Sequence, residues 1–233
     1  MSEPRRLLLA GATGLVGRAI IDAAVGHGEL RLVAVARREM PLPEGARMEL
    51  LVAAAEGWPA AIAAARPNAV LIALGTTIAA QNGDREAFVA IDHDLVVEVA
   101  EAALAAGATH CIVVSSVGAA AQSRNFYLST KGQVEDALGA LGFARLDVLR
   151  PGLLRGARGG AVRLGETLAK IASPVADLML HGGLRRYRSV PARTVAQAML
   201  ALACEGEPGS FVHEHDAIRQ AARAFRGSSA GRR

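Results

Sequence analysis

Tyr127 and Lys131 have the residue types and the spacing for proton-transfer chemistry. They open a segment with helical periodicity, so a separation of four residues puts them one turn apart on the same helix face. An ammonium beside a phenol favours the phenolate, which suits a general acid or base that works near neutral pH. Arginine supplies most of the 26 basic residues, yet this position holds lysine, whose compact ammonium fits among hydroxyl groups better than a planar guanidinium. The alternative is an exposed pair on a solvated helix face.

Two serines precede this pair at the end of an apolar run. Residues 110–115 have the pattern of a buried strand, which leads directly into Ser116. In open α/β sheets ligands bind beyond the carboxyl ends of the strands, so the hydroxyls of Ser115 and Ser116 are expected where the chemistry takes place. The spacing alone does not distinguish the two serines.

A glycine-rich turn near the amino terminus is suited to the phosphates of a dinucleotide. Three glycines stand at the spacing G-x-x-G-x-x-G, between an apolar strand over residues 7–10 and a helical pattern over residues 18–25. The first glycine permits a tight turn, the second lets a pyrophosphate approach the backbone, and the third lets the helix pack closely on the strand. Unpaired N–H groups and the macrodipole at the helix start favour an anion. An ordinary strand-to-helix turn is the alternative. The predicted cofactor contacts are Gly11, Ala12, Thr13, Gly14, Leu15, Val16 and Gly17.

The end of the second strand indicates which nucleotide is bound. Residues 30–36 predict a buried strand that ends in Arg37 and Arg38. A free 2′-hydroxyl is usually held here by an acidic residue, whereas a 2′-phosphate requires a cation. Two guanidiniums can bind phosphate bidentately, so the pair predicts NADP in preference to NAD. The alternative is a solvated loop in an arginine-rich chain.

Three further groups of residues have weaker patterns. A strand over residues 69–74 ends at small residues that either line the nicotinamide half of the cofactor or only form a turn. Two groups are assigned to solvated surfaces: an acidic cluster on a helix over residues 86–106, which has no further ligand at metal-binding spacing, and an arginine cluster that could otherwise receive an anionic substrate. No metal site is predicted. These three groups are Leu74, Gly75 and Thr76; Asp92, His93 and Asp94; and Arg185, Arg186 and Arg188.

Length and composition favour an α/β protein. The 233 residues are 52% hydrophobic but only 3% aromatic, which indicates a core of Ala, Leu and Val, as in parallel strands covered by alanine-rich helices. We expect a Rossmann-like doubly wound parallel sheet with a small C-terminal substrate region: one NAD(P)-binding domain over residues 1–225, with a core at 5–152 and the substrate region at 153–225, then a disordered tail at 226–233. Further strands are expected over residues 48–52, 146–150 and 211–212, and further helices over 53–66, from 127 onward, and over 162–171 and 191–204.

Composition also excludes several classes of partner. No apolar run approaches the ~20 residues that span a bilayer, and the apolar start of the chain is broken by glycine too soon for a signal peptide. Basic residues are scattered among acidic ones and give a net charge of only +4, so nucleic-acid binding is not expected. Two cysteines in apolar segments indicate no disulfide framework and a cytoplasmic location. A small-molecule substrate is expected, and the oligomeric state is left open.

The glycine turn, Ser116, Tyr127 and Lys131 together resemble the short-chain dehydrogenase/reductase superfamily. Segments 114–118, 125–135, 149–154 and 189–196 are similar to its atypical branch, typified by the Tat-interacting-protein oxidoreductase, and the resemblance covers about residues 5–215. It implies that Tyr127 is the catalytic acid/base, that Lys131 holds the nicotinamide ribose, and that Ser116 bonds the substrate carbonyl. It also implies that Pro151, Gly152 and Leu153 pass beside the nicotinamide.

The residues and the resemblance together predict an NADP-dependent carbonyl reductase with a Ser-Tyr-Lys site. Hydride transfer would belong to the cofactor, while the protein would supply position and a proton. Two alternatives stay open: a regulatory protein that senses NADPH without turnover, and an NAD(P)-dependent epimerase or dehydratase that uses the same residues without net nucleotide consumption.

Overall fold

Seven parallel strands form the central sheet in the order β3-β2-β1-β4-β5-β6-β9. This computed structural model describes residues 4–156 and 180–230. The order reverses between β1 and β4, which is the switch point where open α/β sheets bind ligands. The strands are β1 (Arg5–Ala10), β2 (Leu30–Ala36), β3 (Met48–Val52), β4 (Ala69–Ile72), β5 (His110–Val114), β6 (Arg145–Leu149) and β9 (Gly209–His213).

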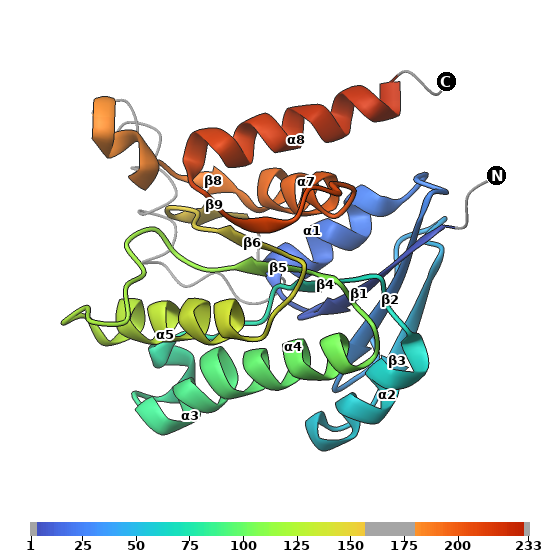
Figure 1. The fold of residues 1–233 in the computed structure, drawn as a ribbon, viewed down its shortest axis with the longest axis horizontal. Helices are drawn as coiled ribbons and strands as arrows, with labels where there is room; N and C mark the ends of the chain where they lie inside the picture. Colours follow the sequence, from blue (N-terminus) through green and yellow to red (C-terminus); the bar gives the residue numbers. More distant parts are fainter. Residues whose placement is uncertain (1–3, 157–179, 231–233) are drawn as a thin grey trace.

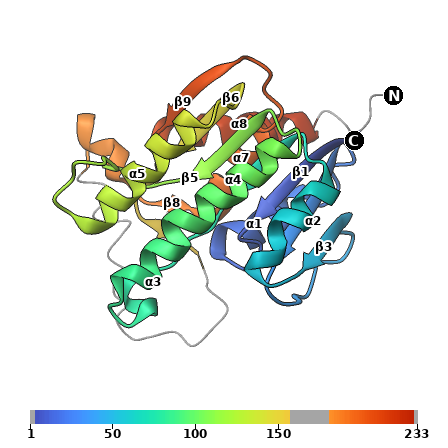
Figure 2. The same ribbon diagram turned by 60° about the horizontal axis from the view of Figure 1, so that its bottom comes forward.

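Helices cover both faces of this sheet (Figure 1). One layer holds α1 (Leu15–Ala24), α7 (Ala192–Leu202) and α8 (His215–Ala230). The other holds α2 (Trp58–Ala65), α4 (Leu95–Ala105) and α5 (Phe126–Ala140), and Figure 2 shows α4 and α5 running side by side there.

The central strands are buried on both faces. In β1, Leu7 and Leu9 pack toward α1 and α7, whereas Leu8 and Ala10 pack toward α2 and α4, and all four side chains are fully buried. For this reason the sequence of β1 is a continuous apolar run and does not alternate between apolar and polar residues.

Short elements complete the chain. They are the 3₁₀ helices η1 (Ala55–Gly57), η2 (Ile78–Gln81) and η4 (Gly182–Tyr187), the helix α3 (Arg85–Val89), the π-helical turn η3 (Ala90–Asp94) that joins α3 to α4, and the pair of strands β7 (Leu154–Arg155) and β8 (Val190–Pro191).

The doubly wound parallel sheet predicted from the sequence is confirmed. The short strand expected near residue 211 is β9, the seventh strand of the main sheet, and α7 and α8 belong to one of its helical layers. Residues 226–230, expected to be a disordered tail, lie in α8, while residues 231–233 are outside the described range. The helix expected over residues 162–171 also lies outside the described residues.

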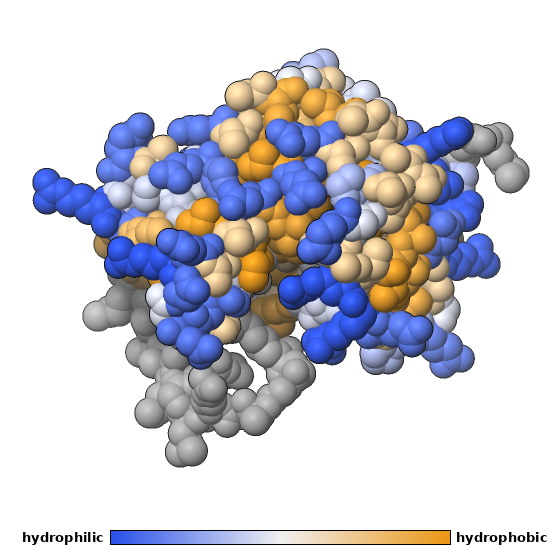
Figure 3. All heavy atoms as spheres, turned by 90° about the horizontal axis from the view of Figure 1, so that it is seen from below, coloured by the Kyte–Doolittle hydropathy of each residue, from blue (hydrophilic) through white to orange (hydrophobic). Residues whose placement is uncertain are grey.

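The outer surface mixes hydrophilic and apolar side chains on the face that Figure 3 shows. None of the helices within residues 4–156 and 180–230 has the length and apolar character to cross a bilayer.

Candidate functional site

The glycine turn connects β1 to α1 by very close backbone contacts. Gly11 has a φ of +95°, and a Cβ there would lie 2.4 Å from the carbonyl oxygen of Ala73. A Cβ on Gly17 would lie only 2.1 Å from the carbonyl oxygen of Gly11. Side chains are therefore excluded at both positions, as the spacing predicted.

The amino end of α1 is uncapped by side chains among the described residues. Gly14 is the N-cap residue, and no side chain caps this end of the helix. The first helical hydrogen bond runs from the N–H of Arg18 to the carbonyl of Gly14 at 3.0 Å, so the three preceding N–H groups have no acceptor within the helix. Such a helix start is a ready site for phosphate oxygens, and the turn therefore fits a dinucleotide pyrophosphate.

Tyr127 and Lys131 lie on α5, as predicted. Asn125 begins the helix, since its side-chain oxygen accepts the N–H of Leu128 at 3.1 Å. Tyr127 is partly exposed, and its ring centre lies 6.0 Å from that of Phe88 in α3. Lys131 is only 5% exposed. The face of α5 that carries Tyr127 and Lys131 therefore packs against α3 and the π-helical turn.

Asp92 lies at the candidate site, where the sequence did not place it. It is 1% exposed, and its Oδ1 lies 2.7 Å from the ammonium nitrogen of Lys131. Its Oδ2 accepts the backbone N–H of Thr76 at 2.6 Å, and Gln81 donates to the Thr76 hydroxyl at 3.0 Å. The carboxylate thus joins the lysine of α5 to the loop after β4.

The prediction of a solvated helix face for residues 92–94 is therefore wrong for Asp92. Asp94 is exposed and pairs with His93 at 2.8 Å, as a surface pair does. The missed signal is position: Asp92 stands four residues after Phe88 and four before Val96, and both of these side chains are buried. Among the described residues no group of His, Cys, Asp and Glu is arranged to hold a metal ion.

The two serines after β5 have different environments. The Ser115 hydroxyl donates to Glu135 of α5, and Glu135 also accepts two hydrogen bonds from Arg150 Nε, at 3.0 and 3.1 Å. These bonds from Arg150 to Glu135 raise the pKa of the guanidinium. Ser116 is partly exposed, and its hydroxyl has only a long contact of 3.4 Å with the carbonyl of Val117. The Ser115 hydroxyl is thus engaged in the fold, whereas that of Ser116 is able to meet a ligand.

The loops after β4, β5 and β6 meet at one edge of the sheet. The N–H of Val117 donates to the carbonyl of Pro151 at 3.0 Å. A Cβ on Gly75 would lie 3.5 Å from Asp92 Oδ1, and one on Gly156 would lie 2.6 Å from the Leu15 side chain. The loop after β6 therefore reaches the start of α1. The predicted positions along this edge are Leu74, Gly75 and Thr76, partly buried or exposed, then Pro151, buried, Gly152, partly buried, and Leu153, exposed.

The candidate arginines lie on the surface. Arg37 and Arg38 directly follow β2 and are exposed. In the second group, Arg185 pairs with Asp216 at 3.3 Å, and Arg188 donates to the carbonyl of Leu180 at 2.8 Å. The guanidinium of Arg186 lies 5.1 Å from the ring centre of Tyr187. This second group has the character of the solvated loop that the sequence favoured.

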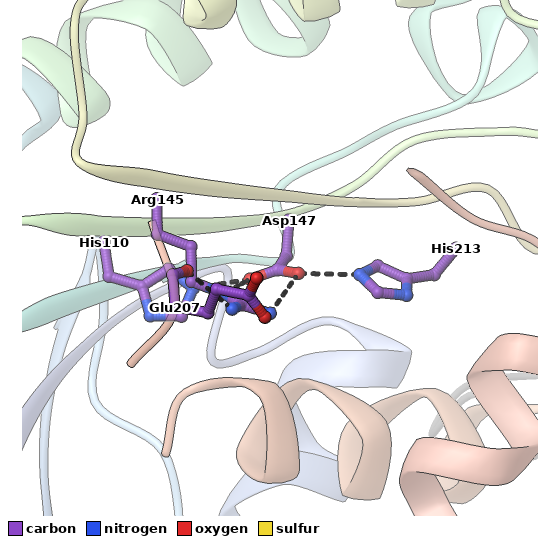
Figure 4. Close-up of polar contacts among 5 residues, drawn as sticks. All are labelled: His110, Arg145, Asp147, Glu207 and His213. Atoms are coloured by element: carbon purple, nitrogen blue, oxygen red, sulfur yellow. Dashed lines mark hydrogen bonds and ion pairs between the residues drawn. The ribbon is translucent and has the colours of Figure 1, made fainter. Parts of the chain in front are cut away.

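A second polar cluster lies under α7 and α8, on the opposite face of the sheet from α5 (Figure 4). Asp147 is completely buried and accepts bonds from His110 at 2.6 Å, His213 at 2.6 Å and Arg145 at 2.6 and 3.1 Å. Burial alone would raise the pKa of Asp147, but the bonds from the two histidines and Arg145 outweigh it and hold the pKa well below its usual range. Arg145 also donates to the carbonyl of Glu207 at 2.8 Å. The cluster links β5, β6 and the edge strand β9.

The fold and the open turn define a dinucleotide-binding protein of the Rossmann-like class. The chain belongs to the NAD(P)H-binding family, whose model matches residues 11–204.

Two fungal proteins are similar to this chain. The chain is 39% identical to protein FMP52 of Eremothecium gossypii over 153 residues, which are 65% of this chain and 67% of that protein. It is 35% identical to FMP52 of Saccharomyces cerevisiae over 161 residues, which are 68% and 69% of the two chains. Both relatives are named as mitochondrial proteins, and this finding overturns the cytoplasmic location predicted from cysteine usage.

Solved structures share the fold at low sequence identity. UDP-glucose 4-epimerase from Thermotoga maritima has a TM-score of 0.66 at 14% identity, with 98% of this chain and 84% of that chain covered. WbmH from Bordetella bronchiseptica, solved in complex with NAD+, has a TM-score of 0.66 at 12% identity, with 97% and 81% covered. NAD(P) binding follows from the family. These similarities do not distinguish NADP from NAD as the nucleotide that is bound.

Proposed function

We propose that this chain is an NADP-dependent oxidoreductase of the atypical short-chain dehydrogenase/reductase branch, which reduces a carbonyl group of a small molecule. One observation carries the proposal: the open start of α1 and the loop that leads to Tyr127 and Lys131 both lie at the carboxyl edge of the sheet, beside its switch point. A bound nicotinamide supplies the hydride that the carbonyl carbon accepts.

The protein residues supply position and a proton. The Tyr127 hydroxyl gives its proton to the carbonyl oxygen, and the Lys131 ammonium one turn away stabilises the phenolate left behind. Ser116 orients the carbonyl oxygen, because its hydroxyl is not engaged by Glu135 as that of Ser115 is. Solvent returns a proton to Tyr127, which is partly exposed.

Three features support the nucleotide site. The pyrophosphate is held by the turn over residues 11–17 and by the N–H groups at the start of α1. Asp92 Oδ1 is buried and accepts no hydrogen bond from the described residues beyond its ion pair, so a ribose hydroxyl is a suitable donor to it. Arg37 and Arg38 stand where a 2′-phosphate needs cations, and this favours NADP.

The Tyr127→Phe variant tests the catalytic assignment. It keeps the ring that packs near Phe88 and removes only the acidic hydroxyl. With carbonyl compounds screened against NADPH, we expect kcat/KM to fall by about 10²–10⁴-fold, while NADPH affinity, followed by nucleotide fluorescence, changes little. Tyr187→Phe is the matched control, because Tyr187 is exposed on η4. Equal turnover by Tyr127→Phe and the parent would refute the assignment.

Epimerisation or dehydration is the second candidate. The fold likeness to a UDP-glucose 4-epimerase favours it, since such a reaction would return the nucleotide to its starting state. Product formation without net NADPH consumption would select this candidate over reduction. NADPH binding without turnover of any screened substrate would favour the regulatory alternative instead.

A further inference from the structure

One face of β2 and β3 lacks the helix that a connection between parallel strands usually supplies. The chain passes from β2 to β3 through residues 37–47, a stretch that the structure describes fully and that contains no helix. On one face the two strands pack against Trp58 of α2. On the other face they pack beside α1, and the connecting loop contributes only the partly buried side chains of Met40 and Ala46. An apolar groove is therefore left between α1 and β3.

This groove is large enough for a small molecule. It holds a cavity of about 400 Å³, within the range of about 300–1,000 Å³ that ligand pockets occupy. An adjoining cavity of about 350 Å³ shares part of its lining with the first. His27 bounds the larger cavity, and its ring stacks on that of Phe225 in α8 with 4.4 Å between the ring centres. We call the two cavities the α1–β3 groove, and its apolar wall includes Ile21, Ala24, Leu30, Leu32 and Met48.

The α1–β3 groove is separate from the candidate nucleotide site. Leu30 and Met48 are the first residues of β2 and β3, so the groove lies at the amino ends of these strands. The glycine turn and Ser116 instead follow the carboxyl ends of β1 and β5. In a parallel sheet the two kinds of strand end lie at opposite edges. A ligand in the groove therefore leaves the nucleotide site free.

Arg47 gives the groove a positive charge. It is exposed, lines both cavities, and has no hydrogen bond or ion pair from its guanidinium among the described residues. Two neighbouring carboxylates are already engaged. Glu49 pairs with Arg31, and Glu29 pairs with His27 at 3.1 Å. A guanidinium beside an apolar wall is matched by a carboxylate on an apolar chain, because the guanidinium binds both oxygens while the chain is removed from water.

We propose that the α1–β3 groove binds a medium-chain fatty carboxylate. The apolar chain lies against α1 and β2, and the carboxylate binds Arg47. This site goes beyond the proposed function, because it takes part in no step of carbonyl reduction.

Isothermal titration calorimetry with decanoate, below its micelle concentration, tests the proposal. We expect one decanoate to bind per chain, with an affinity that saturating NADPH leaves unchanged. Octanoate, which lacks two methylene groups, should bind about tenfold more weakly. Decan-1-ol has the same chain length without the charge, and it should also bind about tenfold more weakly than decanoate.

Two substitutions with matched controls locate the site. Ala24→Phe places a ring in the larger cavity and should abolish decanoate binding, whereas Ala140→Phe should not. Each of these alanines is the last residue of its helix, and Ala140 is exposed. Arg47→Gln should weaken decanoate binding about tenfold and leave decan-1-ol binding unchanged. Arg219→Gln, which alters an exposed arginine on α8, should change neither.

Several results would overturn the proposal. Decanoate binding that survives Ala24→Phe, or that saturating NADPH abolishes, would place the ligand elsewhere. A dimer in light scattering that dissociates in Ala24→Phe would assign the groove to an interface between copies of this chain. If Ala24→Phe does not fold, Arg47→Gln decides, because Arg47 is exposed; equal effects on decanoate and decan-1-ol would then refute the site.

The titration also separates this inference from the proposed function. Calorimetry with decanoate needs no turnover, so a chain that reduces no carbonyl would still show whether the groove is occupied. A chain that reduces a carbonyl but binds no decanoate would keep the function and lose the inference.

Discussion

Replacing Gly17 with alanine tests whether the contact between β1 and α1 builds the nucleotide site. A Cβ at this position would lie 2.1 Å from the Gly11 carbonyl oxygen and 2.8 Å from the Ala12 Cα, and both atoms belong to the backbone. Gly139 on α5 is the matched control, because a Cβ there meets nothing within 4 Å. Both substitutions add one methyl group to a helix.

The two variants are expected to differ in the sign of their stability change. In a helix, alanine is more stable than glycine by about 0.5–1 kcal/mol, so Gly139→Ala should stabilise the protein by that amount. At Gly17, relief of the overlap requires α1 to move away from the turn by roughly 1 Å, and overpacking of this kind costs about 1–3 kcal/mol. We expect a net destabilisation of about 1–2 kcal/mol for Gly17→Ala once the gain in helix propensity is subtracted.

Thermal unfolding and NADPH fluorescence measure the two consequences. For a chain of this length, 1 kcal/mol shifts Tm by about 2–4 °C, so Gly17→Ala should lower Tm by about 2–8 °C. Its NADPH affinity should fall at least about tenfold, because the N–H groups at the start of α1 are displaced from the phosphates. Gly139→Ala should bind NADPH as the parent does. A Gly17→Ala variant with parental Tm and parental affinity would refute the close contact and the site built on it.

Two further variants test other parts of the molecule. Asp147→Asn removes the charge that pairs with buried Arg145, so we expect a loss of about 3–5 kcal/mol at pH 7 in chemical denaturation. Because the pKa of Asp147 is lowered in the folded state, its stabilisation is complete above the unfolded pKa of about 3.9 and is lost as pH falls below it, so the difference between variant and parent should shrink in acid. Arg37→Gln/Arg38→Gln should weaken NADPH binding at least about tenfold and leave NADH affinity nearly unchanged, and equal losses for both nucleotides would contradict a 2′-phosphate site.

The sheet could be predicted because its strands are buried on both faces. β2 and β3 have the bounds that the apolar runs indicated, and the glycine spacing predicted the turn between β1 and α1. Such patterns depend on residues that are close together in the sequence. The seventh strand was predicted only as a short segment, because β9 lies at the sheet edge with a partly exposed surface and pairs with β6 across a separation of 64 residues in register.

The polar contacts could not be predicted, because they join segments far apart in the chain. Asp92 and Lys131 meet only when α3, the π-helical turn and α5 are packed together. Asp147 lies in a strand among apolar neighbours, and its partners come from β5 and β9. In both cases the available signal was an acidic residue on an otherwise buried stripe, which predicts a buried partner but does not identify it.

The prediction of a cytoplasmic location was wrong for a different reason. Two cysteines without a disulfide framework indicate only reducing conditions, and they do not select one compartment. The fungal relatives are named as mitochondrial, so cysteine usage was not sufficient evidence for the cytoplasm.

Each strand end at the candidate site is joined to a neighbouring segment. The loop after β4 is bound by Asp92 through the Thr76 N–H, the end of β5 is bound by Glu135 through Ser115, and Glu135 in turn binds Arg150 at the end of β6. These contacts are made between the protein's own groups, so they hold the strand ends at this edge of the sheet in a fixed arrangement, which reduces the ordering that ligand binding requires. Asp92 and Glu135 therefore belong to the candidate site together with the serine, tyrosine and lysine that the sequence singled out.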